Sequence, residues 1–167
     1  VNQIETAVTQ QVDAIVISPI DEQAPLPAAR TAKDAGIPVF TAGNRLADDE
    51  LVVSEIGADY SEMGRLNAEY VAEQLGGSGV VATIHGIRGV TFTEDQIDGL
   101  TEVFKAHPDI EVVDGGYADG YSADVGLSQT ENLLAANPGR IDAIMFDSDD
   151  LAVGGIKALR AQGVSPD

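Results

Sequence analysis

Short apolar runs alternate with helical patterns along this chain, and that alternation limits the possible folds more than any single motif does. The runs are rich in Val and Ile and lie at residues 12–18, 37–41, 79–85, 110–113 and 141–147, with a weaker one at 52–57. Continuous apolar runs of this length are typical of parallel strands that helices cover on both faces. The sequence therefore predicts an α/β fold with parallel sheets.

The segments between these runs carry recognisable helix ends. Asp59 with Glu62, and Thr93 with Gln96, have the spacing of a capping box, in which two side chains satisfy free N–H groups at a helix start. The other predicted helix starts are Pro25 with Pro27, Ser122, and Ser148 or Asp149, and the predicted stops are Gly36, Gly76-Gly77, Asn137-Pro138-Gly139 and Gly163. The repeated strand–helix–strand order predicts open twisted sheets with right-handed crossovers.

The two ends of the chain do not coincide with the ends of such a repeat. Val1, Ile4 and Val8 already have helical spacing, with no strand before them, and residues 163–167 stop where a further strand is expected. We therefore expect the sequence to be an internal fragment of a longer protein.

Composition excludes several classes of partner and cofactor. The chain has 28 acidic and nine basic residues, a formal net charge of −19, which repels phosphate backbones and makes nucleic acid an unexpected partner. It has no cysteine, so disulfides and thiolate metal sites are impossible. The two histidines, His85 and His107, have no second metal ligand near them in sequence, and we expect no metal or other cofactor.

One enzymatic alternative arises at the end of the last apolar run. Asp147 and Asp149 are two residues apart at a strand tip, an arrangement that resembles the nucleophile and general acid of haloacid-dehalogenase-like phosphatases, which use magnesium. Leu151 departs from that pattern, because the family usually has a small Thr or Val there. Asp149 and Asp150 are also explained by the helix dipole, which favours carboxylates in a first turn. Catalysis is therefore the less favoured interpretation.

Polar and aromatic side chains follow the predicted strands. In parallel sheets, ligands bind beyond the carboxyl ends of the strands. A sugar presents hydroxyls and apolar C–H faces, so its site needs carboxylates, amides and hydroxyls beside an aromatic ring. Residues of these types are Asn44, Asp59, Gln96, Tyr121, Ser148 and Asp149. The sequence thus favours a site for a neutral sugar or polyol.

Several blocks of the sequence resemble the periplasmic sugar-binding proteins of the ribose-binding type. The blocks lie at residues 12–21, 32–39, 56–60, 64–65, 98–100 and 147–154. The resemblance implies the type I periplasmic-binding-protein fold, with two Rossmann-like lobes that hold a sugar between them and deliver it to the membrane permease of an ATP-driven importer. By the same resemblance, residues 1–57 are part of the N-terminal lobe, without its first strand, and residues 58–167 are an incomplete C-terminal lobe.

The resemblance also assigns ligand contacts by position. The matching positions are Ser18, Ala58, Ile87, Gln96, Tyr121 and Ser148, with Asp149 next to the last. Ribose binders have an Arg where this chain has Gln96, an Asn where it has Ser148, and Asp-Arg near Asn44-Arg45. Loss of a forked cationic donor removes a bidentate grip on ring oxygens. These differences indicate a ligand other than ribose, such as an uncharged polyol, a deoxy sugar or a cyclitol.

The same resemblance extends to the sugar-sensing cores of lactose-repressor-like transcription regulators, which are the main alternative. The acidic charge and the Ser18-Pro19-Ile20-Asp21 block favour the transport branch. We accordingly expect a non-enzymatic solute receptor that acts in the periplasm or outside the cell, with or without a lipid anchor.

Overall fold

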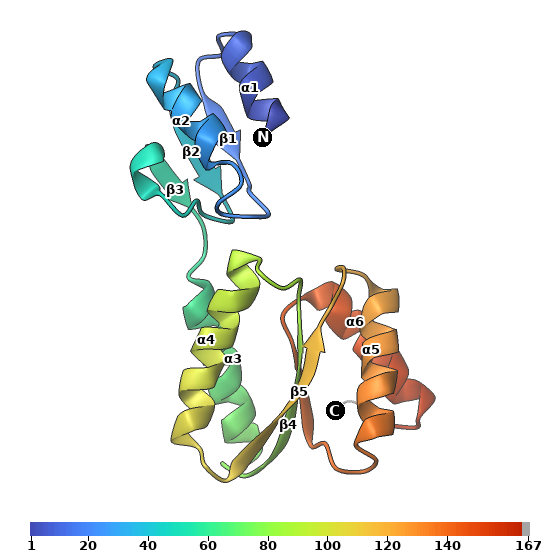
Figure 1. The fold of residues 1–167 in the computed structure, drawn as a ribbon. Coiled ribbons are helices and arrows are strands. Elements are labelled where there is room, and N and C mark those ends of the chain that lie inside the picture. The colour runs from blue at the N-terminus through green and yellow to red at the C-terminus, as the bar shows by residue number, and fades with distance from the viewer. Residues whose placement is uncertain (165–167) are drawn as a thin grey trace. The chain divides into compact units, whose positions relative to one another are not determined.

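The structure, a computed structural model, describes residues 1–164 and divides into two compact units. The first comprises Val1–Asp59 with Gly89–Phe92, and the second comprises Tyr60–Arg88 and the residues from Thr93 onward. The helices are α1 (Asn2–Thr9), α2 (Leu26–Asp34), the short 3₁₀ helix η1 (Asp49–Leu51), α3 (Tyr60–Gln74), α4 (Thr91–Ala106), α5 (Ala123–Ala136) and α6 (Asp149–Ala161). The strands are β1 (Ile15–Ile17), β2 (Val39–Ala42), β3 (Ser54–Ile56), β4 (Gly79–His85), β5 (Ile110–Tyr117) and β6 (Ala143–Phe146) (Figure 1).

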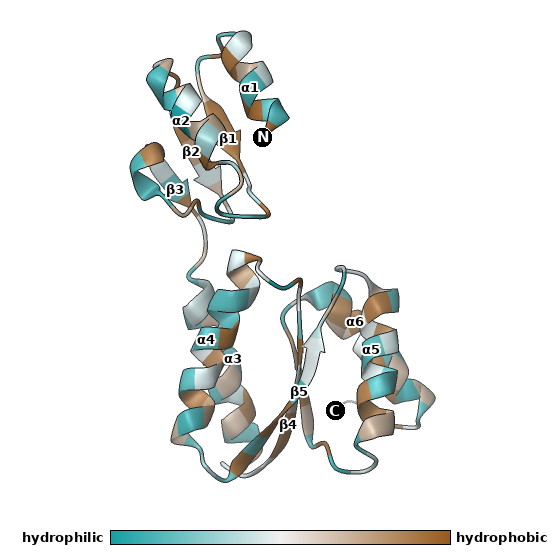
Figure 2. Cartoon of the chain, viewed as in Figure 1, coloured by the Kyte–Doolittle hydropathy of each residue, from teal (hydrophilic) through white to brown (hydrophobic). Residues whose placement is uncertain are grey.

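The first unit contains a parallel sheet in the order β1-β2-β3. Ile15 pairs with Val39, and Phe40 pairs with Ser54. The apolar side of α1 packs on this sheet through Ile4, as its helical spacing predicted. Apolar residues gather along β1 in Figure 2. The core of this unit consists of Ile4, Ile15, Ala28, Ala32, Ile37 and Val39.

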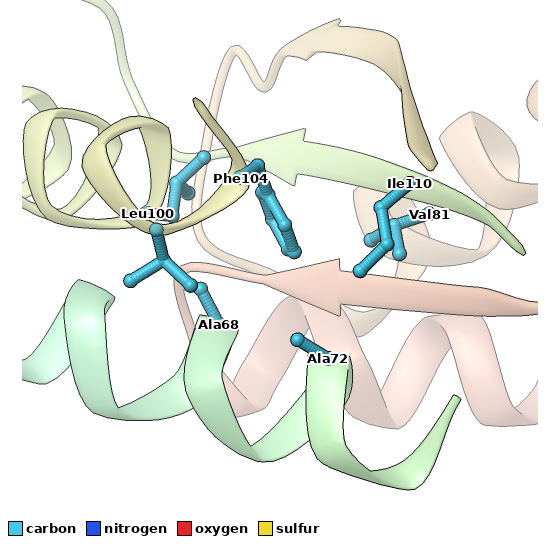
Figure 3. Close-up of a cluster of buried hydrophobic side chains, with 7 residues drawn as sticks. Ala68, Ala72, Val81, Leu100, Phe104 and Ile110 are labelled. Atoms are coloured by element: carbon cyan, nitrogen blue, oxygen red, sulfur yellow. The ribbon is translucent and has the colours of Figure 1, made fainter. Parts of the chain in front are cut away.

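The second unit contains a parallel sheet in the order β5-β4-β6, with β4 in the centre. Helices α3 and α4 cover one face, and α5 and α6 cover the other (Figure 1). Val81 of β4 packs in a cluster with Leu100 and Phe104 of α4 (Figure 3), whereas its neighbours Ala82 and Ile84 pack with residues of α5 and α6. The predicted parallel strands, covered on both faces, are therefore confirmed.

The helices on each face of this sheet cross at glycines. A Cβ atom on Gly126 of α5 would lie 2.1 Å from the backbone oxygen of Leu151 of α6, and one on Gly154 would lie 2.0 Å from that of Ala123. On the opposite face, Gly64 of α3 meets the backbone of Gln96 in the same way. Backbones this close leave no room for a side chain at these glycines, so the start of α6 is fixed against α5.

Two strand boundaries differ from the prediction by more than two residues. β1 begins at Ile15 rather than at residue 12, because the chain turns at Gln11, with φ of 55°, and Val12 packs into the core without pairing. β5 continues to Tyr117 instead of ending at residue 113, so that Tyr117 lies opposite His85 beyond an irregularity in the register.

Most helix ends lie where they were predicted, and one does not. Ser122 accepts a hydrogen bond from the Val125 N–H at 3.3 Å, and α3 begins directly after Asp59 and ends before Gly76. Ser148 is at the N-cap position of α6, although its side chain makes no capping hydrogen bond. Thr93 was predicted to cap a helix but lies inside α4, which begins at Thr91. Its side chain is fully buried and contacts Tyr121 instead.

Candidate functional site

The candidate site in the second unit lies at the carboxyl ends of β4, β5 and β6. Ile87 follows β4, Tyr121 follows β5, and Ser148 with Asp149 follows β6. Gln96 comes from α4, and its amide Nε2 donates to the backbone oxygen of Asp147, the residue before Ser148, at 3.4 Å. Because parallel strands end at the same edge of a sheet, five of the predicted ligand residues lie along one edge.

Tyr121 is fixed by its hydroxyl group. The Ile87 N–H donates to the Tyr121 hydroxyl at 2.9 Å, and the Thr93 hydroxyl lies 3.2 Å from it. Gly86 makes this approach possible, because a Cβ atom there would lie 2.6 Å from the Tyr121 hydroxyl oxygen. The hydroxyl is thus engaged within the protein, and the half-buried ring is the part of Tyr121 suited to the apolar face of a sugar.

Replacing Tyr121 with Phe should lower the free energy of unfolding by about 1–2 kcal/mol, because the Ile87 N–H loses its acceptor. Chemical denaturation followed by circular dichroism measures this change. Tyr70→Phe, on an exposed side chain of α3, is the matched control and should shift the free energy by less than about 0.5 kcal/mol. Equal changes in the free energy of unfolding for the two substitutions would show that the Tyr121 hydroxyl does not stabilise the segment around Ile87.

The side chain of Asp147 is buried against the end of β4. Its carboxylate accepts a hydrogen bond from the Gly86 N–H at 2.9 Å and lies 3.4 Å from Nδ1 of His85. The side chains of Asp147 and His85 are only 6% and 7% exposed. A carboxylate engaged in this way is poorly placed to act as a nucleophile, which weighs against the dehalogenase-like alternative.

A second cluster at this edge was not predicted from the sequence. The Arg88 guanidinium lies 3.8 Å from the centre of the Tyr117 ring, and the Tyr117 hydroxyl donates to Glu94 at 3.2 Å. Burial, reinforced by the negative charge of Glu94, raises the pKa of Tyr117. Arg88 follows β4 and Tyr117 ends β5, so their pairing depends on the late end of β5.

The other predicted ligand residues belong to the first unit. Ser18 is exposed after β1, and Asp59 is exposed before α3. Asn44, after β2, donates from its amide Nδ2 to the backbone oxygen of Pro19 at 2.8 Å, while its buried Oδ1 atom has no hydrogen-bond partner within residues 1–164. Asn44 therefore ties together the segments that follow β1 and β2. Ala58 is exposed beside Asp59.

Two further features of the described residues bear on other kinds of site. Within residues 1–164, no group of three or more His, Asp or Glu side chains is arranged to hold a metal ion. In the same part of the chain, no helix combines the length and apolar character needed to cross a membrane.

The family of the chain follows from comparison with known proteins. The model of the periplasmic binding protein domain matches residues 1–167, the whole chain. The chain therefore belongs to the periplasmic binding protein family, and the predicted resemblance and fold class are confirmed.

Individual relatives are sugar-binding proteins. The ribose import binding protein of Bacillus subtilis is 30% identical over 97% of this chain and 52% of its own length. A periplasmic ribose ABC transporter structure from Conexibacter woesei is 39% identical, with a TM-score of 0.87 over 99% of this chain and 55% of that one. A solute-binding protein from Bacillus halodurans with bound myo-inositol has 29% identity and a TM-score of 0.91, over 97% of this chain and 56% of that one. The chain spans about half the length of these relatives.

Proposed function

We propose that the protein containing this chain is the extracytoplasmic substrate-binding component of a sugar ABC importer, and not an enzyme. Its ligand would be a monosaccharide or polyol, its partner a membrane permease, and its location the periplasm or the outside of the cell. Residues 1–57 would be part of its N-terminal lobe and residues 58–167 part of its C-terminal lobe. The main support is the set of five predicted ligand residues along one sheet edge, in a chain whose relatives are import binding proteins.

The chemistry of this edge suits a neutral ligand. Gln96 provides a neutral amide at a position where the ribose-binding resemblance implies an arginine, so a bidentate cationic donor is missing there. Ser148 and Asp149 provide a hydroxyl and a carboxylate that can bind sugar hydroxyls, and the Tyr121 ring provides an apolar surface. An uncharged polyol, a deoxy sugar or a cyclitol fits this combination.

Titration calorimetry on the intact protein tests the proposal. The panel contains xylitol, D-fucose and myo-inositol, for the polyol, deoxy sugar and cyclitol classes, together with D-ribose for comparison. At least one should bind with a Kd below about 1 mM, a modest affinity on the free-energy scale of binding. Absence of binding throughout the panel would count against the proposal, and steady phosphate release from a generic phosphoester with magnesium would favour the phosphatase alternative.

Asp149→Ala should weaken binding of the preferred sugar by about 1.5–3 kcal/mol, because a carboxylate that accepts a sugar hydroxyl is lost. Asp150→Ala is the matched control, since Asp150 is also exposed, lies in the same first turn of α6 and has the same favourable interaction with the helix dipole. It should leave the Kd within about a factor of two. Similar losses in both variants would indicate a general effect of charge and not a sugar contact.

A further inference from the structure

Asp147 connects three of the segments that form the candidate site. It lies between β6 and α6, directly before Ser148, and its backbone N–H donates to the Ile84 oxygen at 3.3 Å. Its carboxylate accepts from the Gly86 N–H, so it holds the chain that leads to Ile87. Its backbone oxygen accepts from the Gln96 amide on α4. One residue therefore contacts the segments after β4 and β6 and the side chain of Gln96.

The surroundings of this carboxylate are closed and polar. A buried carboxylate is stable only when hydrogen bonds or an opposite charge compensate for its lost hydration. Besides accepting from the Gly86 N–H, the carboxylate lies 3.4 Å from Nδ1 of His85, a buried atom that has no hydrogen-bond partner among the described residues. Nε2 of the same ring lies 3.0 Å from the Thr83 hydroxyl and 3.8 Å from the exposed Asp114 carboxylate. The Asp147 side chain is thus directed toward β4 and surrounded by protein groups.

We propose that Asp147 is a positioning residue of the sugar-binding edge, which orients Gly86-Ile87 through its carboxylate and Gln96 through its backbone oxygen without itself contacting the sugar. This inference rests on the proposed function, and it adds a residue that the predicted ligand set does not contain. Because Asp147 orients other residues of the site and does not contact the sugar, loss of its side chain weakens the binding of all ligands by a similar factor. Loss of a contact residue such as Ser148 changes the preference among ligands.

The test compares Asp147→Ala with Asp147→Asn in the intact protein. Asp147→Ala should weaken binding of every panel sugar that the wild type binds by a similar factor, about ten- to a hundredfold. Asp147→Asn should keep the affinity within about threefold, because the amide oxygen can take the place of Oδ2 and still accept the Gly86 N–H. Ser148→Ala, in contrast, should alter the order of affinities within the panel.

A second measurement needs no ligand. Hydrogen exchange followed by NMR should show faster exchange of the Gly86 amide in Asp147→Ala, and wild-type protection in Asp147→Asn. If Asp147→Asn loses about tenfold or more in affinity while the Gly86 amide stays protected, the carboxylate contacts the sugar and the proposal is overturned. Unchanged Gly86 exchange in a folded Asp147→Ala variant also overturns it. If the wild type binds no panel sugar, the proposed function fails, while the exchange measurement still decides whether Asp147 holds the Gly86 backbone.

Discussion

Leu151→Ala should lower the free energy of unfolding by about 3–5 kcal/mol, the range for removing a large aliphatic side chain from a rigid core. Leu151 is fully buried and packs in a cluster with Ala82 and Ile84 of the central strand β4. It lies in the first turn of α6, two residues after Asp149, so it also anchors the segment that presents the proposed sugar contacts. We therefore expect a loss of sugar affinity together with the loss of stability.

Val153→Ala on the same helix is the control for this prediction. The Val153 side chain is 48% exposed, so the truncation should change the free energy of unfolding by less than about 0.5 kcal/mol. Denaturant titration with circular dichroism measures both variants. A loss below about 1 kcal/mol for Leu151→Ala would mean that this core collapses around the missing side chain.

Gly126→Ala should destabilise the protein by about 3 kcal/mol, the upper end of the usual cost of overpacking. Alanine is the better helix former by about 1 kcal/mol, so intrinsic propensity alone predicts the opposite sign. The added Cβ would lie 2.1 Å from the Leu151 backbone oxygen, and a backbone atom cannot rotate away as a side-chain end can. Helices α5 and α6 must therefore move apart.

Gly120→Ala provides the comparison for this substitution. Among residues 1–164, nothing lies within 4 Å of where a Cβ on Gly120 would be placed, and Gly120 does not have positive φ, so alanine there should leave the melting temperature equal or slightly higher. Differential scanning calorimetry gives the melting temperatures of Gly126→Ala and Gly120→Ala for comparison with the wild type. A melting temperature of Gly126→Ala at or above that of the wild type would contradict the close crossing.

The fold could be predicted from the sequence where local signals agree. β4 has the predicted bounds, 79–85, because a glycine stop precedes a continuous apolar run and a loop follows it. The end of β5 was missed because Gly115 and Gly116 are typical of a strand end. In the structure, Gly115 lies so close to β4 that a Cβ atom would be 2.6 Å from the Thr83 oxygen. A glycine within a strand often marks such an approach of two backbones, which only the tertiary structure shows.

The location of the candidate site at one edge of the sheet could be predicted, but the hydrogen bonds among its residues could not. The rule that ligands bind beyond the carboxyl ends of parallel strands led to Tyr121, Gln96 and Ser148. The contacts of Thr93 and Asp147 could not be predicted, because their partners, Tyr121 and Gly86, are 28 and 61 residues away in sequence. Whether the predicted residues of both units bind a ligand stays a prediction.

Main-chain groups make several of the hydrogen bonds that hold the candidate site together. They are the N–H groups of Gly86 and Ile87 and the backbone oxygen of Asp147. Substitutions at exposed neighbouring positions leave these groups in place. Exposed residues such as Asp149 can therefore be exchanged over evolutionary time while the scaffold persists. An architecture of this kind allows ligand preference to diverge between descendants of one ancestor without rebuilding the protein interior.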